Sequence, residues 1–148
     1  MRKNGFTALE LLIVMTIAGL VTAAGAPSFF KFIEHQRVVS GAQMIVGDAW
    51  LARSRAVTRA ESWELRFRRD TQAYEVWRVF DPTSVAGPKL IKRVSLPVNV
   101  WVESTTMPRI TFAPDGTASM TGEVTVGNRK TDRLTVGITQ FIGRAVIK

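Results

Sequence analysis

The N-terminal region holds one long apolar run, interrupted near its start by a single carboxylate, and this feature constrains the fold most. No charged residue occurs from Leu11 to Ala26, directly after Glu10. The stretch from Phe6 to Phe30 is long enough to cross a bilayer, which needs about 20 residues. Arg2 and Lys3 precede it, so the excess of positive charge predicts a cytoplasmic N-terminus and an exported remainder.

Three interpretations of this run are open. A secretory signal peptide would be cut near the small residues Ala23–Ala26 and would release a soluble protein, such as a secreted enzyme. A plain membrane anchor would keep Glu10 in or near the bilayer, where an unpaired carboxylate costs a few kcal/mol unless it reaches the interface. In the third interpretation the chain is cut between Gly5 and Phe6. The new α-amine then lies one helical turn from Glu10, and the amine of a neighbouring copy could neutralise this carboxylate.

The stretch KNGFTALELLIVMTIAGL resembles the prepilin signature of type IV pilins and type II secretion pseudopilins. The shared pattern is a short basic leader, Gly before the cut, Phe after it, and then T-x-x-E-L-L-I-V. The resemblance implies that prepilin peptidase cuts between Gly5 and Phe6 and that the Phe6 amine is methylated. It also implies that Glu10, the fifth residue after the cut, is the family's filament-assembly glutamate.

A helix is predicted from the cut to about Arg59. Small and β-branched residues recur at steps of four and three after the apolar run and form one stripe suited to packing on a sheet: Val38, Ala42, Ile45, Ala49, Ala52 and Ala56. Pro27 removes one helix hydrogen bond, which predicts a kink at this position. The alternative is that Pro27 ends the membrane helix.

The period changes to two after the helix, where Trp63, Leu65 and Phe67 alternate with charged residues. YEVWRVF predicts a second strand, KLIKRVSLPVNVWVES one or two strands around Pro97, and RITFAPDGTASMTGEVTVGN two strands about a P-D-G turn. RLTVGITQFIGRAVIK predicts a final strand or hairpin. The predicted fold class is therefore α+β, with a long N-terminal helix packed on a C-terminal antiparallel β-sheet or sandwich.

Three segments follow from these predictions. They are a leader over 1–5, a long helix over 6–60 with its transmembrane part at about 6–30, and an antiparallel β domain over 61–148. The four tryptophans (Trp50, Trp63, Trp77 and Trp101) are expected to pack in the core.

The β region extends the resemblance. ITFAPDGTAS, followed by a strand and a late GRAVIK, is similar to the GspH/FimT family of minor pilins and pseudopilins. That resemblance implies a subunit of a type IV pilus or type II secretion pseudopilus, with a structural role in filament initiation, assembly or the tip complex. The implied partners are other pilins, prepilin peptidase, an inner-membrane assembly platform and membrane lipid. The implied location is a single pass through the inner membrane with the C-terminal domain in the periplasm, and then the filament.

The residue inventory offers no enzyme chemistry. There is no cysteine, which excludes disulfides and thiol chemistry. The single histidine, His35, lies beside Glu34 on the predicted helix, where a solvated position is the ordinary interpretation. No cofactor and no metal site are expected, and the protein is not expected to be an enzyme.

The formal charge of +8 raises a second candidate function. Basic residues gather toward the C-terminus, namely Arg129, Lys130, Arg133, Arg144 and Lys148, and these are candidates for non-specific contacts to DNA phosphates. Some FimT-type minor pilins are DNA receptors for natural transformation through a basic segment that begins with Gly-Arg, a position that Arg144 fits. Ala145 and Val146 depart from a denser basic run. The alternative is that these cations lie on solvated faces with some ion pairs, or touch neighbouring pilins. The same alternative applies to the cations near the helix-to-sheet junction, which are Arg53, Arg55, Arg59, Arg66, Arg68 and Arg69.

Overall fold

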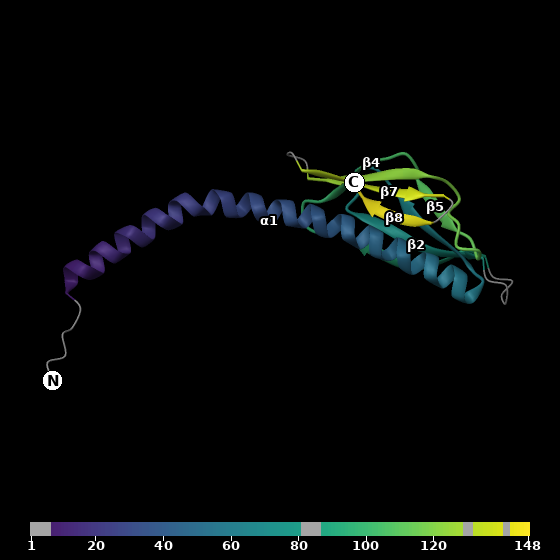
Figure 1. The fold of residues 1–148 in the computed structure, drawn as a ribbon, viewed down its shortest axis with the longest axis horizontal. Coiled ribbons are helices and arrows are strands. Elements are labelled where there is room, and N and C mark those ends of the chain that lie inside the picture. The colour runs from purple at the N-terminus through teal and green to yellow at the C-terminus, as the bar shows by residue number, and fades with distance from the viewer. Residues whose placement is uncertain (1–6, 81–86, 129–131, 141–142) are drawn as a thin grey trace, which may run out of the picture. The chain divides into compact units, whose positions relative to one another are not determined.

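The computed structural model describes residues 7–80, 87–128, 132–140 and 143–148, and the side chains of 24, 26 and 27 are not described. Helix α1, Ala8–Arg59, precedes eight strands in the described residues. The chain forms two compact units, Met1–Ile33 and Glu34–Lys148, and the order of their elements along the chain can be followed in Figure 1.

The N-terminal unit is the first part of α1, and its apolar side chains face outward on every side. Leu9 is 69% exposed, Leu12 65% and Phe30 65%. The helix continues through Pro27, so the alternative in which this proline ends the helix is wrong. Among the described residues no single helix meets the length and hydropathy of a membrane span, although the stretches Ala8–Ala23 and Ser28–Arg59 meet them together as a bent pair.

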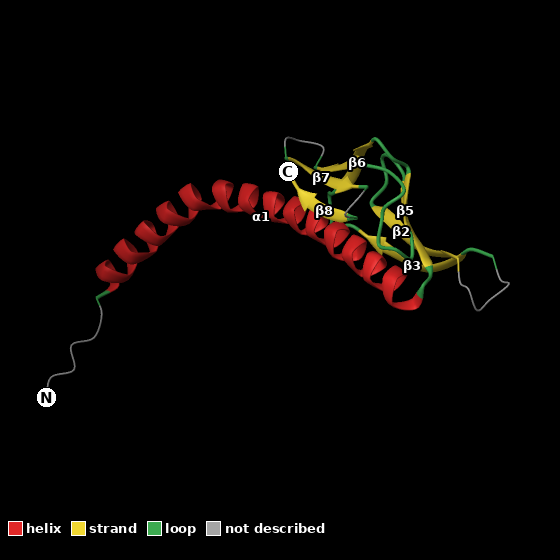
Figure 2. Ribbon diagram, turned by 45° about the vertical axis from the view of Figure 1, so that its right-hand side comes forward, coloured by secondary structure: helices red, strands yellow, loops and turns green. Residues whose placement is uncertain are grey.

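The second part of α1 belongs to the C-terminal unit and buries one face there. The six stripe residues predicted from the sequence are all buried, none more than 1% exposed: Val38, Ala42, Ile45, Ala49, Ala52 and Ala56. Four of the six are alanines, which keep the helix close to the strands that run beside it (Figure 2). The predicted arrangement of helix on antiparallel sheet is therefore confirmed.

Eight strands form two four-stranded sheets. The first has the order β3-β2-β1-β5, from Lys89–Ser95, Ala73–Phe80, Ser62–Phe67 and Arg109–Phe112. The second has the order β4-β6-β7-β8, from Trp101–Thr105, Gly122–Gly127, Arg133–Thr139 and Arg144–Ile147. Every described strand pair is antiparallel. The segment around Pro97 gives two strands in different sheets, and the C-terminal segment gives the hairpin β7–β8.

One core joins the helix to both sheets. It includes Leu65, Phe67 and Phe112 from the first sheet and Val124, Val136 and Ile138 from the second. Trp63 is 3% exposed and confirms the expectation of core packing, but Trp50 is 67% exposed and contradicts it. Trp50 follows the stripe residue Ala49, and successive residues turn by about 100° around a helix, which carries Trp50 off the buried face.

Candidate functional site

The first turn of α1 is closed by a reciprocal capping box between Thr7 and Glu10. The Thr7 amide and hydroxyl both donate to Glu10 Oε2, at 3.0 and 3.1 Å, and the Glu10 amide donates to Thr7 Oγ1 at 3.2 Å. This S/T-x-x-E pattern satisfies amide groups that a helix start leaves without partners. The four letters T-A-L-E carry the signal in the sequence, and the sequence analysis missed it.

The capping box changes how Glu10 is understood. Its carboxylate has partners within its own chain, yet the side chain is exposed and can accept another donor. Gly5 and Phe6, where cleavage and methylation are expected, lie outside the described residues. The assembly role of Glu10 and the kink at Pro27 stay predictions.

The described members of the predicted basic group do not form one cluster: Lys148 lies near Arg133, because its amide donates to the Thr135 carbonyl at 2.8 Å, whereas Arg144 lies elsewhere. Arg133 Nη2 lies 2.6 Å from Glu103 Oε1, and Lys148 Nζ lies 2.5 Å from Glu123 Oε1. Arg144 is exposed and forms no ion pair with the described residues. Arg129 and Lys130 lie outside the described residues, so nothing is said of their placement.

Strand register separates Arg133 from Arg144. Arg133 begins β7, whereas Arg144 pairs with Thr139 at the other end of that strand. Six steps along a strand correspond to about 20 Å. The two arginines therefore lie at opposite ends of the second sheet.

The two elements that carried the GspH/FimT resemblance meet in space. The Gly116 amide donates to the Ala113 carbonyl at 2.9 Å, which closes a turn with Pro114 at its second position, as the sequence predicts. The Gly116 carbonyl lies so close to Gly143 that a Cβ added at Gly143 would come within 2.5 Å of it. Arg53 of α1 donates from Nε to the same carbonyl at 3.0 Å. The sequence elements are therefore joined to each other and to the helix.

Asp115 supports this turn, as its sequence context predicts. Its Oδ1 accepts from the Thr117 hydroxyl at 2.7 Å and from the Thr117 amide at 2.9 Å. These two hydrogen bonds lower the pKa of Asp115 below its ordinary value, because both favour the ionised carboxylate. Asp115 is thus a turn residue with its charge retained at neutral pH.

Two arginines of the helix-to-sheet junction stack on tryptophans. The Arg55 guanidinium lies 5.1 Å from the centre of the Trp63 ring, and that of Arg66 lies 4.2 Å from the Trp77 ring. Arg66 also bonds the Glu64 carboxylate. These contacts agree with the alternative in which junction cations form local ion pairs.

His35 is half exposed, with Nδ1 3.9 Å from Asp132 Oδ1. That distance is too long for a hydrogen bond. Within the described ranges no group of His, Asp and Glu residues is arranged to hold a metal ion.

A long N-terminal helix packed on antiparallel sheets is also the arrangement of solved minor pilins and pseudopilins. A family model described as type II transport protein GspH matches residues 41–140, more than half of the chain. The chain belongs to this family.

Solved structures share the fold. Type IV minor pilin FimU from Pseudomonas aeruginosa matches with a TM-score of 0.60 and 20% identity, over 79% of this chain and 92% of that one. Minor pseudopilin EpsH from the type II secretion system of Vibrio cholerae matches with a TM-score of 0.60 and 12% identity, over 76% of this chain and 94% of that one. A search of curated proteins finds no match.

Proposed function

We propose that this chain is a filament subunit of a type IV pilus or type II secretion pseudopilus, with a structural role in initiation, assembly or the tip complex. The observation that carries the proposal is the capped start of a helix whose apolar side chains are exposed in the single chain. Such a surface needs lipid first and neighbouring helices later. The chain waits in the inner membrane with its C-terminal unit in the periplasm and then enters the filament through the assembly platform.

Cleavage supplies the partner for Glu10 in this proposal. Prepilin peptidase cuts between Gly5 and Phe6, and the Phe6 amine becomes methylated. The positive amine of an adjoining subunit then pairs with the Glu10 carboxylate in a dry bundle, so one ion pair sets the axial register. The exposure of Glu10 at the helix start supports this step.

The capping box shows which variants test the register. Glu10→Ala removes both the charge and the cap, so a loss of assembly in this variant has two causes. Glu10→Gln removes the charge and keeps a capping side chain, because glutamine serves at this position of the box. Thr7→Ala is the matched control, because it removes the cap and keeps the charge.

Filament incorporation of each variant is measured by immunoblotting sheared filaments, with cleavage checked by mass spectrometry. We expect Glu10→Gln to be cleaved normally but to be incorporated into filaments as poorly as Glu10→Ala. Thr7→Ala should be incorporated much better than either of these variants. Normal incorporation of Glu10→Gln would show that the charge sets no register. Detection of residues 1–5 still attached to the functional protein would contradict the whole proposal.

A second candidate function is capture of DNA during uptake. Arg144 lines a hollow of about 340 Å³ together with Trp50 and Arg53 of α1. Trp50 is exposed, so this hollow is lined by both cations and an accessible aromatic ring, the two kinds of group that single-stranded DNA binders use. This observation favours Arg144 over Arg133 and Lys148, the other described members of the predicted basic group.

The test is binding of a labelled single-stranded oligonucleotide to the full chain in detergent. We expect Arg144→Gln with Lys148→Gln to weaken binding and to reduce its salt dependence, by about 0.7 in log–log slope for each lost phosphate contact. The matched control, Arg93→Gln with Arg109→Gln, removes two charges from the first sheet and should change binding little. Absence of binding at low salt would exclude DNA capture.

A further inference from the structure

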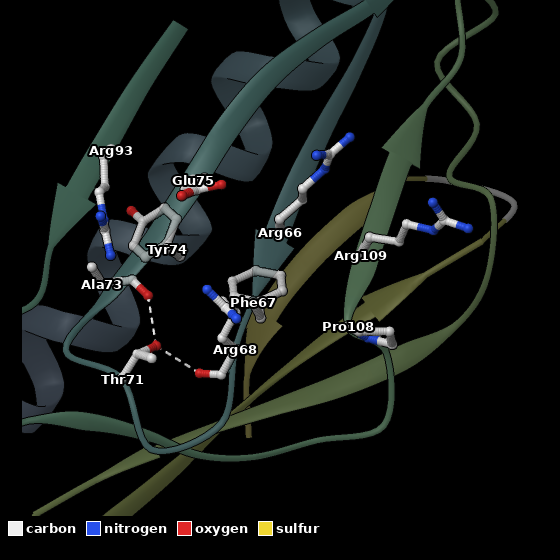
Figure 3. Close-up of a pocket in the computed structure, with 10 residues that line it drawn as sticks. All are labelled: Arg66, Phe67, Arg68, Thr71, Ala73, Tyr74, Glu75, Arg93, Pro108 and Arg109. Carbon is white, nitrogen blue, oxygen red and sulfur yellow. Dashed lines mark hydrogen bonds between the residues drawn. The ribbon is translucent and has the colours of Figure 1, made fainter. Parts of the chain in front are cut away.

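A basic pocket lies on the first sheet, and none of its lining residues is among those singled out for assembly or DNA. It has a volume of about 530 Å³ and is lined from β1, β2, β3 and β5 and the adjoining turns (Figure 3). Its charged lining residues are Arg66, Arg68, Arg93, Arg109 and Glu75. Four cations against one carboxylate give this lining a net charge of +3.

Strand register places four of these residues in one row across the sheet. Glu75 pairs with Arg93 of β3 on one side and with Arg66 of β1 on the other. Arg66 in turn pairs with Arg109 of β5. Directly opposed residues of antiparallel strands point to the same face, so all four side chains share one face.

That face is the one turned away from the helix. Tyr74 and Lys92 each precede a member of the row and therefore point to the other face. Tyr74 Oη donates to Asp48 Oδ2 at 2.7 Å, and Lys92 Nζ lies 2.5 Å from Asp48 Oδ1 of α1. Because Tyr74 and Lys92 point toward the helix, the side chains of the arginine row point away from the helix.

Part of the pocket is already held in place. Arg66 bonds Glu64 and stacks over Trp77, and Trp77 Nε1 donates to Glu75 Oε2 at 2.9 Å. The Thr71 hydroxyl bonds the carbonyls of Arg68 and Ala73, at 2.7 and 3.0 Å, which shapes the turn below the pocket.

Three cations of the pocket have no carboxylate partner in the described residues. Arg68, Arg93 and Arg109 form no ion pair or hydrogen bond through their guanidinium groups there. A guanidinium group presents paired donors that match the two oxygens of a carboxylate. The pocket thus offers ordered surroundings and uncommitted donors for an anion.

We propose that this pocket binds an acidic, extended polypeptide segment of a partner protein through its carboxylates. Charge complementarity supports an anionic occupant, and strand β3 supports an extended one. In the described pairings β3 pairs with β2 alone, so its other edge offers main-chain donors and acceptors beside Arg93.

A nucleic acid fits this pocket less well. A phosphate backbone favours a continuous run of cations, whereas Glu75 interrupts this row between Arg93 and Arg66. An acidic peptide can place its carboxylates on either side of Glu75 and donate main-chain N–H groups to it. The inference does not rest on the filament role, because it concerns only the C-terminal unit.

The probe is a capped, fluorophore-labelled octapeptide of alternating glutamate and serine, titrated into the full chain in non-ionic detergent and followed by anisotropy. Its control replaces each glutamate by glutamine. We expect the acidic peptide to bind and the neutral one to bind at least about tenfold more weakly. Loss of two charge-assisted contacts in Arg93→Gln with Arg109→Gln should weaken binding by about tenfold or more.

The matched variant, Arg144→Gln with Lys148→Gln, removes the same charge from the second sheet and should change binding less than about twofold, since it alters only the long-range field. Arg93→Lys with Arg109→Lys keeps the charge and loses the paired donors. Its affinity for the acidic peptide should therefore lie between the affinities of the two glutamine variants. This variant also tests the proposal if the glutamine variant does not fold.

Three results would overturn the inference. One is absence of binding by the acidic peptide. Another is an equal loss in both glutamine variants, which would indicate diffuse charge attraction rather than a pocket. The third is displacement of the peptide by an equally charged oligonucleotide that binds more tightly and depends on Arg93 and Arg109, which would assign the pocket to nucleic acid.

Discussion

The two compact units contain similar kinds of apolar residues but differ in where these residues can be buried. In the N-terminal unit Leu12 is 65% exposed, whereas in the C-terminal unit Leu65 is fully buried. A helix that is apolar all round has no polar face to give to water, while a helix with one apolar stripe can complete a domain. The N-terminal unit therefore leaves its apolar surface uncovered in the single chain, whereas the C-terminal unit supplies its own core.

The most direct test of this difference is to make the same substitution, leucine to alanine, in each unit. Leu65→Ala should lower the free energy of unfolding of the C-terminal unit by about 2–5 kcal/mol, because it removes core contacts and leaves a cavity. Leu12→Ala should change that quantity by no more than about 0.5 kcal/mol. Denaturant titration of the full chain in detergent, followed by tryptophan fluorescence, measures both. Equal effects would show that the N-terminal unit is part of the same core.

Glycines give the next largest contrast. Gly143 has a φ of +54°, and a Cβ there would meet the Gly116 carbonyl oxygen at 2.5 Å. Gly143→Ala should therefore cost about 2 kcal/mol or more, from the left-handed conformation and from the collision. In Gly25→Ala of the N-terminal unit the new Cβ would meet nothing within 4 Å beyond the neighbouring residues and backbone of its own helix, so it should not destabilise the C-terminal unit. Unchanged unfolding of Gly143→Ala would contradict the close approach.

Tyr74 gives a pH-dependent reporter that exists only in the C-terminal unit, since the chain has a single tyrosine. Burial, followed by the hydrogen bond to the Asp48 carboxylate, raises the pKa of Tyr74 well above its ordinary value. The unfolded tyrosine loses its proton near pH 10 and the folded one does not. Above about pH 10 this difference in the protonation of Tyr74 should therefore reduce the free energy of unfolding by about 1.4 kcal/mol per pH unit.

Tyr74→Phe removes the ionisable hydroxyl, so its free energy of unfolding should fall less steeply with rising pH in alkali than that of the wild type. The same variant loses the hydrogen bond to Asp48, which should cost about 1 kcal/mol at neutral pH. Tyrosinate absorbance of the folded wild type should stay low until the protein unfolds. Ionisation of Tyr74 in the folded protein near pH 10 would refute the argument.

The smallest effect is expected at Trp50, which resembles the N-terminal unit in exposing its apolar surface. Trp50→Ala should change the free energy of unfolding by less than about 0.5 kcal/mol, because the side chain is 67% exposed. The same denaturant titration measures it, with Trp63 still reporting from the core. A loss of several kcal/mol would place Trp50 in the core after all.

Sequence periodicity predicted the long helix, its buried stripe and the antiparallel strands, because period and composition are local properties. The T-A-L-E capping box is equally local, because its pattern alone indicates a helix start, but it was not among the sequence predictions. The wrong expectation at Trp50 has a different origin. Hydrophobicity alone favoured burial, whereas the turn of the helix placed this residue off the stripe.

By itself the sequence determined which segments are helix or strand and the family to which its motifs belong. Only the tertiary structure decided which distant residues meet. Strand register gathered Arg93, Arg66 and Arg109 into one row and placed Arg133 and Arg144 at opposite ends of the paired strands β7 and β8. The physical reason is that periodicity reports the face on which a side chain points, while pairing between strands far apart in the chain decides its neighbours.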